Sequence, residues 1–396
     1  MLNFLYVGVG QCGNKFVDAF ALNKNTAVAV NTTQKDMESL KHLDRQNLVN
    51  ITANGSKGGA GKTPALGAKA MQEHIDDVYA RLMSLGAEAD YFFLWAGLGG
   101  GTGSGGLPVL LKRLLENKKK VILGLTLPDD TEGVEVQVNA FNACIQILKL
   151  IESYKVPYLL IENNKIKNKM QQVNSIDWAT VNGILSKTFT QFNKSANKTS
   201  PYSTFDETDF KKTLYVKGMM ALVRVSLDVK DIQNDISLRD AIVNAWTKDN
   251  YFVDFDYATA SIMTTIIEAP EDFLENKSNY KLIESSLLKL RDACGTISPY
   301  TGIYPYNERK ESRGNKIVVY SMLTGLKAPM EKLVALQTKA KEEQEAMQKK
   351  KESNSVDFSE FAAIGNVFDT ESDDNDKSLS GLNALDSDKE PELDFM

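Results

Sequence analysis

The sequence has few cysteines and histidines and no long apolar run. Cys12, Cys144 and Cys294 lie far apart without a CxxC pair. We therefore expect neither a disulfide framework nor a thiolate zinc site, and a reducing compartment is indicated. The sequence has only two histidines, His42 and His74, so catalysis by histidine side chains is not favoured. No run reaches the roughly 18 to 20 apolar residues that cross a bilayer, and no signal peptide is recognisable, so we expect a cytoplasmic protein without a membrane partner.

Acidic residues are concentrated near the C-terminus. Residues 353–396 hold twelve Asp and Glu side chains against two lysines, a net charge of −10, while the 396-residue chain carries −6, which leaves +4 for residues 1–352. A segment this acidic cannot bury enough apolar surface to offset its ordering entropy. The sequence predicts a disordered acidic tail over residues 353–396, preceded by a charged helix over residues 331–352.

The first part of the chain alternates between short apolar runs and helical patterns. Strands are expected over residues 2–9, 27–31, 48–52, 91–96, 121–126 and 158–161, and helices among them over residues 65–85, 107–117 and 134–154. This alternation favours an α/β fold: a parallel sheet with helices on both faces and a ligand site at the carboxyl ends of the strands.

A long buried helix is expected over residues 177–192, and the polar stretch 193–203 after it indicates a domain boundary. Further elements follow, namely a helix over 238–246, a β-branched run over 258–267, a helix over 281–292 and a strand over 316–323. The predicted parts are a nucleotide-binding domain (1–175), a central helix with its connection (176–203), a smaller α+β domain (204–328), a C-terminal helix (329–352) and the tail (353–396).

Three glycine-rich strings suggest a nucleotide site. Residues 96–106 read AGLGGGTGSGG between a predicted strand and a predicted helix, where consecutive amides and the helix dipole can face a phosphate. Residues 8–13, GVGQCG, satisfy G-x-G-x-x-G, and residues 57–63, KGGAGKT, approach a P-loop. Their placement after strands argues against flexible linkers.

Two other classes of nucleotide-binding protein fit the strings less well. A dinucleotide site needs an acidic residue about 20 positions after the first string, where the second strand ends in Asn31, Thr32 and Thr33. A ParA-type ATPase needs glycine where this chain has Ser56, and it carries its P-loop on the first strand. A ParA-like ATPase stays an alternative.

Together the strings resemble the tubulin/FtsZ GTPase superfamily. Residues 96–106 contain its signature GGGTGSG, and residues 10–14, GQCGN, resemble the first phosphate loop of tubulins. The resemblance extends from residue 2 to about residue 329. It is greatest to the plasmid and phage segregation tubulins of the TubZ type, in residues 31–36, 161–165 and 392–396. It implies that residues 1–175 bind GTP or GDP with Mg²⁺ and that residues 204–328 form an activation domain.

The resemblance also implies the residues of the site. Phosphates would be held by Gly10, Gln11, Cys12, Gly99, Gly100, Gly101, Thr102 and Gly103, with Lys62 beside the terminal phosphate. Glu132 would meet the ribose, although Val136 stands where many relatives carry arginine. Asn163 and Asn182 would read the guanine edge, assisted by Asn14, because an amide offers a donor and an acceptor. Asn182 could instead be a polar residue of the buried helix. No protein ligand is assigned to the metal.

Asp206 and Asp209 are the expected catalytic acids. In the family, two acids three residues apart enter the pocket of the next subunit and position the attacking water. Phosphoryl transfer depends on positioning and charge stabilisation, so acids supplied by a neighbour would couple hydrolysis to assembly. The alternative role for Asp206 is that of a helix N-cap.

The resemblance thus implies a polymerising GTPase that forms head-to-tail filaments in the cytoplasm. Its cargo would be plasmid or phage DNA, held through a separate DNA-binding adaptor on the C-terminal region and not by direct contact with nucleic acid. The alternatives are an FtsZ-like cell-division GTPase, the ParA-like ATPase, and a nucleotide-binding scaffold that does not hydrolyse.

Overall fold

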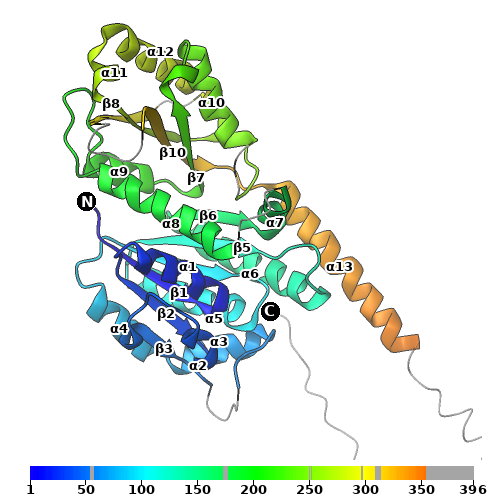
Figure 1. Cartoon of the computed structure of the whole chain (residues 1–396). Coiled ribbons are helices and arrows are strands. Elements are labelled where there is room, and N and C mark those ends of the chain that lie inside the picture. The colour runs from blue at the N-terminus through cyan, green and yellow to red at the C-terminus, as the bar shows by residue number, and fades with distance from the viewer. Residues whose placement is uncertain are drawn as a thin grey trace, which may run out of the picture. The chain divides into compact units, whose positions relative to one another are not determined.

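The strands of this computed structural model form one sheet. Residues 1–53, 58–172, 177–248, 250, 252–295, 298–307 and 314–353 are described, and within them the strand order is β3-β2-β1-β4-β5-β6-β7-β10-β8-β9 (Figure 1). The first six strands are β1 (Phe4–Val9), β2 (Ala27–Asn31), β3 (Leu48–Asn50), β4 (Tyr91–Gly97), β5 (Val121–Leu127) and β6 (Pro157–Glu162). They pair in parallel, which confirms the predicted α/β fold and all six expected strands.

Four further strands extend this sheet: β7 (Gly218–Asp228), β8 (Ile262–Pro270), β9 (Ser298–Tyr306) and β10 (Lys316–Leu326). β7 continues the parallel pairing next to β6, and β10 lies antiparallel between β7 and β8. A continuous sheet does not locate a domain boundary, so the predicted division at residues 203 and 204 stays a prediction.

Helices cover both faces of the sheet. In chain order they are α1 (Gly10–Leu22), α2 (Gln34–Glu38), α3 (Pro64–Glu73), α4 (Ile75–Leu85), α5 (Gly101–Glu116), α6 (Val134–Glu152), α7 (Asn163–Gln172), α8 (Trp178–Ser195), α9 (Glu207–Leu214), α10 (Asp235–Thr247), α11 (Glu271–Glu275), α12 (Lys277–Cys294) and α13 (Met330–Ser353). Alternate residues of β1 enter different cores, Val7 on the side of α5 and Tyr6 on the side of α1 and α8. On the second side Tyr6 stacks on Phe20 with ring centroids 4.0 Å apart.

Two expectations about helices were wrong in detail. The single helix expected over residues 65–85 is two helices, α3 and α4, because His74 leaves the helical conformation and its Nε2 lies 3.0 Å from the carbonyl oxygen of Thr52. Trp178, expected on the buried face of α8, is 41% exposed. The other apolar residues of the expected pattern, Val181, Leu185, Phe189 and Phe192, are buried.

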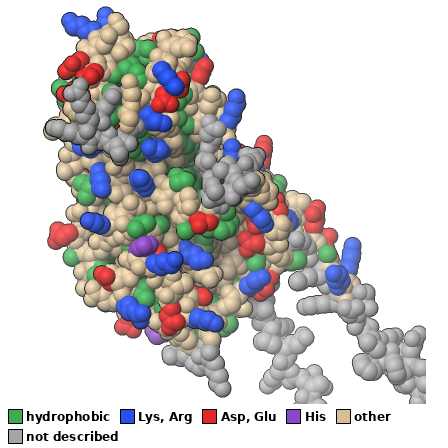
Figure 2. All heavy atoms as spheres, in the orientation of Figure 1, with side chains coloured by type: hydrophobic (Ala, Val, Ile, Leu, Met, Phe, Trp, Pro, Cys, Tyr) green, Lys and Arg blue, Asp and Glu red, His purple; other side chains and the backbone are tan. Residues whose placement is uncertain are grey.

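The C-terminal part matches the expected helix, since α13 spans Met330–Ser353. The predicted tail, residues 353–396, lies outside the described residues apart from Ser353. Residues 1–345 form one compact unit and residues 346–396 a second, so most of α13 belongs to the first. In the part of the chain that is described, no helix has the length and apolar character needed to span a membrane. Figure 2 shows basic and acidic side chains interspersed on the face viewed, as expected from the small net charge of residues 1–352.

Candidate functional site

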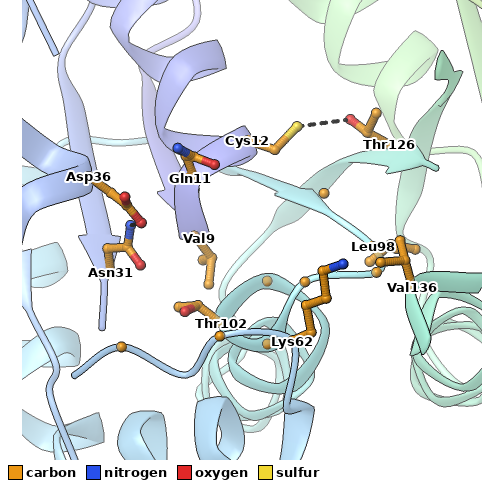
Figure 3. Close-up of a pocket in the computed structure, with 18 of the residues that line it drawn as sticks. Val9, Gln11, Cys12, Asn31, Asp36, Lys62, Leu98, Thr102, Thr126 and Val136 are labelled. Atoms are coloured by element: carbon orange, nitrogen blue, oxygen red, sulfur yellow. Dashed lines mark hydrogen bonds between the residues drawn. The ribbon is translucent and has the colours of Figure 1, made fainter. Parts of the chain in front are cut away.

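A pocket of about 520 Å³ opens where the parallel strands end (Figure 3). Its wall includes Val9 and Gly97, at the ends of β1 and β4, and Thr126 near the end of β5. Asn163, directly after β6, closes one side. The pocket therefore occupies the edge expected for a ligand in a parallel α/β sheet, and its volume suits a nucleotide.

Two helices begin at the pocket. α1 starts at Gly10 and α5 at Gly101, and neither N-cap residue caps its helix with a side chain. Gly10 has φ +75°, and a Cβ placed there would lie 3.0 Å from the amide nitrogen of Gly103, so the two helix starts lie against each other. Free N-terminal amides and two helix dipoles in one place favour an anion such as a phosphate.

Two of the expected phosphate-binding amides also donate within the protein. The Gly99 amide donates to Ser104 Oγ at 2.7 Å, and the Gly101 amide donates to the Gly61 carbonyl at 2.8 Å. These bonds shape the turn between β4 and α5. Gly99, Gly100, Gly101, Thr102 and Gly103 all line the pocket, as do Gly10, Gln11 and Cys12.

The third glycine string packs over the start of α5. The Ala60 amide donates to Thr32 Oγ1 at 3.0 Å, and that hydroxyl lies 2.7 Å from Thr102 Oγ1. Asn139 Nδ2 donates to the carbonyl of Lys62 at 2.6 Å, which fixes the backbone there. The Lys62 side chain extends from this loop toward the pocket (Figure 3). Its ammonium group can thus counter negative charge in the pocket.

The opposite side of the pocket carries amide side chains. Asn163 lines the pocket and also an adjoining cavity of about 200 Å³, which Asn182 and Trp178 line as well. The Oδ1 atoms of Asn163 and Asn182 are buried and have no hydrogen-bond partner among the described residues. Buried polar atoms are usually satisfied. Two unpaired carbonyl oxygens therefore suit a planar base whose edge donates N–H groups, as guanine does.

Asn14, Cys12 and Glu132 differ in how they meet the pocket. Asn14 is 1% exposed, donates to the Val30 carbonyl at 3.4 Å and lines neither cavity. Burial raises the pKa of the Cys12 thiol, whose Sγ lies 3.7 Å from Thr126 Oγ1, so the group stays protonated and acts as a wall. Glu132 lines the pocket while its Oε1 accepts from the Asp129 amide at 3.1 Å.

Comparison with known proteins agrees with this geometry. Residues 3–171 match the model of the GTPase domain of the tubulin/FtsZ family. The chain carries a tubulin/FtsZ-family GTPase domain. The expected family, its GTPase class and its nucleotides, GTP and GDP, are thereby confirmed.

Relatives of the tubulin/FtsZ family extend the match along the chain. The tubulin-like protein CetZ of Pyrococcus furiosus is 29% identical over 90% of this chain and 97% of the relative. The tubulin-like protein TubZ of Bacillus cereus is 26% identical over 89% of this chain and 86% of the relative. A GTPγS-form protofilament of TubZ from Bacillus thuringiensis serovar israelensis superposes with a TM-score of 0.73 at 18% identity, covering 88% of this chain and 94% of that chain. These matches support a tubulin-like, filament-forming GTPase, and they do not distinguish a TubZ-type from a CetZ-type role.

Magnesium is the usual partner of GTP in this family, and the pocket fits it. The described residues contain no cluster of three His, Cys, Asp or Glu that could hold a metal ion by itself. Mg²⁺ beside a nucleotide needs few protein ligands, because phosphates and waters supply most of its oxygens. Asp36 and Glu132 add carboxylate oxygens to the wall, and Gln11 adds an amide oxygen.

The sequence did not predict several wall residues, namely Asn31, Thr32, Thr33 and Asp36. Asn31 Nδ2 donates to Asp36 Oδ2 at 3.2 Å, next to the start of α5. The sequence could have indicated these residues, because a polar run follows the second predicted strand and the carboxyl ends of parallel strands meet at one edge of the sheet.

Asp206 and Asp209 lie apart from this pocket and line neither cavity. Asp206 is the N-cap of α9, and its Oδ1 accepts the Asp209 amide at 2.9 Å. The Asp209 carboxylate accepts a hydrogen bond from the backbone of Asp206. Burial, and then the charge of Asp206, raise the pKa of Asp209.

Proposed function

We propose that this chain hydrolyses GTP when its subunits stack head to tail, and that Asp206 and Asp209 of one subunit complete the pocket of the next. The placement of pocket and acids at opposite edges of the sheet carries this proposal. The pocket lies at the carboxyl ends of the strands. The acids follow α8, an 18-residue helix about 27 Å long whose first residue, Trp178, lines the cavity that adjoins the pocket.

Contacts at the amino end of β1 place the acids at the far edge. The Leu2 amide donates to Asn193 Oδ1 at 3.1 Å, and the N-terminal ammonium group lies 3.2 Å from Glu207 Oε2, in the first turn of α9 (Figure 1). Translating one subunit along the strand direction therefore brings an acid pair onto the pocket of its neighbour.

Both carboxylates that line the pocket, Asp36 and Glu132, already accept a hydrogen bond within the chain. A group that positions water needs unused acceptor capacity. The Asp209 carboxylate accepts from the backbone of Asp206 and keeps further acceptor sites, which it can offer to a water after assembly.

We expect GTP, and not ATP, to drive sedimentable filaments of the purified chain. The two unpaired Asn oxygens accept from the N1–H and amino group of guanine, whereas adenine has no N1–H. Filament mass in pelleting assays with either nucleotide measures the preference. Turnover per subunit should rise with protein concentration. Tighter binding of ATP than of GTP would contradict the guanine assignment and support the P-loop alternative.

The cargo is a finer part of the proposal: plasmid or phage DNA, moved through a DNA-binding adaptor on the C-terminal region. The TubZ relative and the acidic composition of residues 353–396 support it. A filament role without DNA is the second candidate, because the CetZ relative has the higher identity. A plasmid-loss assay separates the two candidates. A test plasmid that carries the gene of this chain together with its flanking genes is compared with the same plasmid from which the gene of this chain has been removed.

Truncation after Ser353 is expected to leave polymerisation and GTP hydrolysis near normal and to abolish plasmid retention. The pocket and the acid pair all precede residue 353, so the GTPase does not depend on the segment removed. A pelleting assay and a plasmid-loss assay on the same variant give both readings. If the truncated chain still retains its plasmid, the adaptor binds elsewhere, with α13 as the next site to test.

A further inference from the structure

One face of α13 packs against segments that line the nucleotide pocket. Lys332, Leu336 and Lys339 stand four and three residues apart, which places them on one side of the helix. Leu336 is 8% exposed, and Ala340 beside it is 4% exposed. A cavity of about 180 Å³ remains beneath this stripe, and Lys332 and Lys339 line it.

The two lysines contact two different segments next to the pocket, namely the end of β6 and the loop between β5 and α6. Lys332 Nζ lies 3.2 Å from Oε2 of Glu162, the buried last residue of β6, directly before Asn163. Lys339 Nζ donates to the Asp130 carbonyl at 2.7 Å and lies 3.1 Å from its Oδ1. Asp130 belongs to the loop between β5 and α6, which also contains Glu132.

The loop between β5 and α6 connects Glu132, which is assigned to the ribose, with the segment that carries Asn163, which is assigned to the base. The Asp130 amide donates to Oδ1 of Asn164, the residue after Asn163, at 2.7 Å. Asp129 is held by Lys167 of α7 at 3.0 Å and accepts from Gln137 of α6 through its carbonyl at 2.7 Å. The loop thus has anchors on α6, α7 and α13, and the anchor on α13 is a single side chain.

We propose that Lys332 and Lys339 are positioning residues for the nucleotide, which hold Asn163 and Glu132 in place and thereby slow nucleotide release. The proposal rests on the assignment of Asn163 and Glu132 to the base and the ribose. Neither lysine lines the pocket, so each acts through the residue that it contacts. A helix that only closes the core would affect stability without changing the release rate.

Lys339→Ala is expected to speed release of a fluorescent GDP analogue about 3- to 10-fold, because it removes a charge-assisted hydrogen bond that is partly exposed to solvent. The measurement uses the full chain below its assembly concentration, chased with unlabelled GDP. Lys339→Arg should restore slow release, since Arg can donate to both Asp130 oxygens. Lys341→Ala is the matched control, because Lys341 is exposed on the same helix and should leave release unchanged.

The Glu162 contact needs a paired variant. Lys332→Met alone leaves a buried carboxylate without its partner and could unfold the chain. Lys332→Met combined with Glu162→Gln removes both charges and should also speed release. Unchanged release in both Lys339→Ala and the paired variant, or equal acceleration in Lys341→Ala, would overturn the proposal. Failure of the unaltered chain to bind the GDP analogue would instead refute the assignment of the pocket.

Discussion

Asp209→Asn is expected to lower GTP turnover of assembled protein by about 100-fold or more, the usual cost of losing one positioning or activating group. GTP affinity of the single subunit should stay near normal, because Asp209 does not line the pocket of its own chain. Filaments should then persist instead of turning over. Phosphate release and pelleting over time give the two readings, and a normal rate would make Asp209 a bystander.

Asp206 needs a different pair of variants, because it caps α9. Asn caps a helix as well as Asp does but has no charge, whereas Ala has neither the charge nor a capping oxygen. Asp206→Asn should therefore keep α9 and lose turnover if the carboxylate has a catalytic role. Normal turnover in Asp206→Asn, with a loss only in Asp206→Ala, would reduce Asp206 to a cap. Glu207→Gln, in the same turn, is the control for charge and should hydrolyse at nearly the normal rate.

The strands that the sequence predicted share a local signal. β1, β2, β4, β5 and β6 are continuous apolar runs, buried on both faces, and such runs are readable without knowledge of their partners. The glycine strings at residues 8–13 and 96–106 were readable for the same reason, since they follow β1 and β4, whereas the string at residues 57–63 follows the shorter and less buried β3.

Several features that were missed depend on distant contacts, although the missed strand β7 has a local apolar run over residues 219–223. β9 contains Pro299, Gly302 and Pro305, residues that argue against a strand, and it forms only because it lies at the sheet edge. The break between α3 and α4 depends on a carbonyl of residue 52, far from His74 in the sequence. The contacts of α13 with Glu162 and Asp130 join residues that are more than 160 positions apart, and no pattern in the helix itself indicates them.

The glycine string itself can be tested one residue at a time. Gly103→Ala should destabilise the chain by about 3 kcal/mol or more and abolish GTP binding, because its Cβ would lie 2.4 Å from the backbone oxygen of Gly97. That oxygen belongs to the last residue of β4 and cannot move without shifting the pocket wall. Thermal unfolding without nucleotide and titration with a fluorescent GTP analogue measure the two effects.

Gly100→Ala is the matched control within the same turn. Gly100 has φ −82°, which alanine adopts readily, and a Cβ there would meet no protein atom within 4 Å. As an N-cap residue, alanine should cost at most about 1 kcal/mol relative to glycine. If both variants lose the same amount of thermal stability, the glycines are required for a reason other than the close approach of the α5 backbone to β4. If Gly103→Ala folds and binds GTP normally, α5 does not need its present distance from β4, and the phosphate cradle must be built differently.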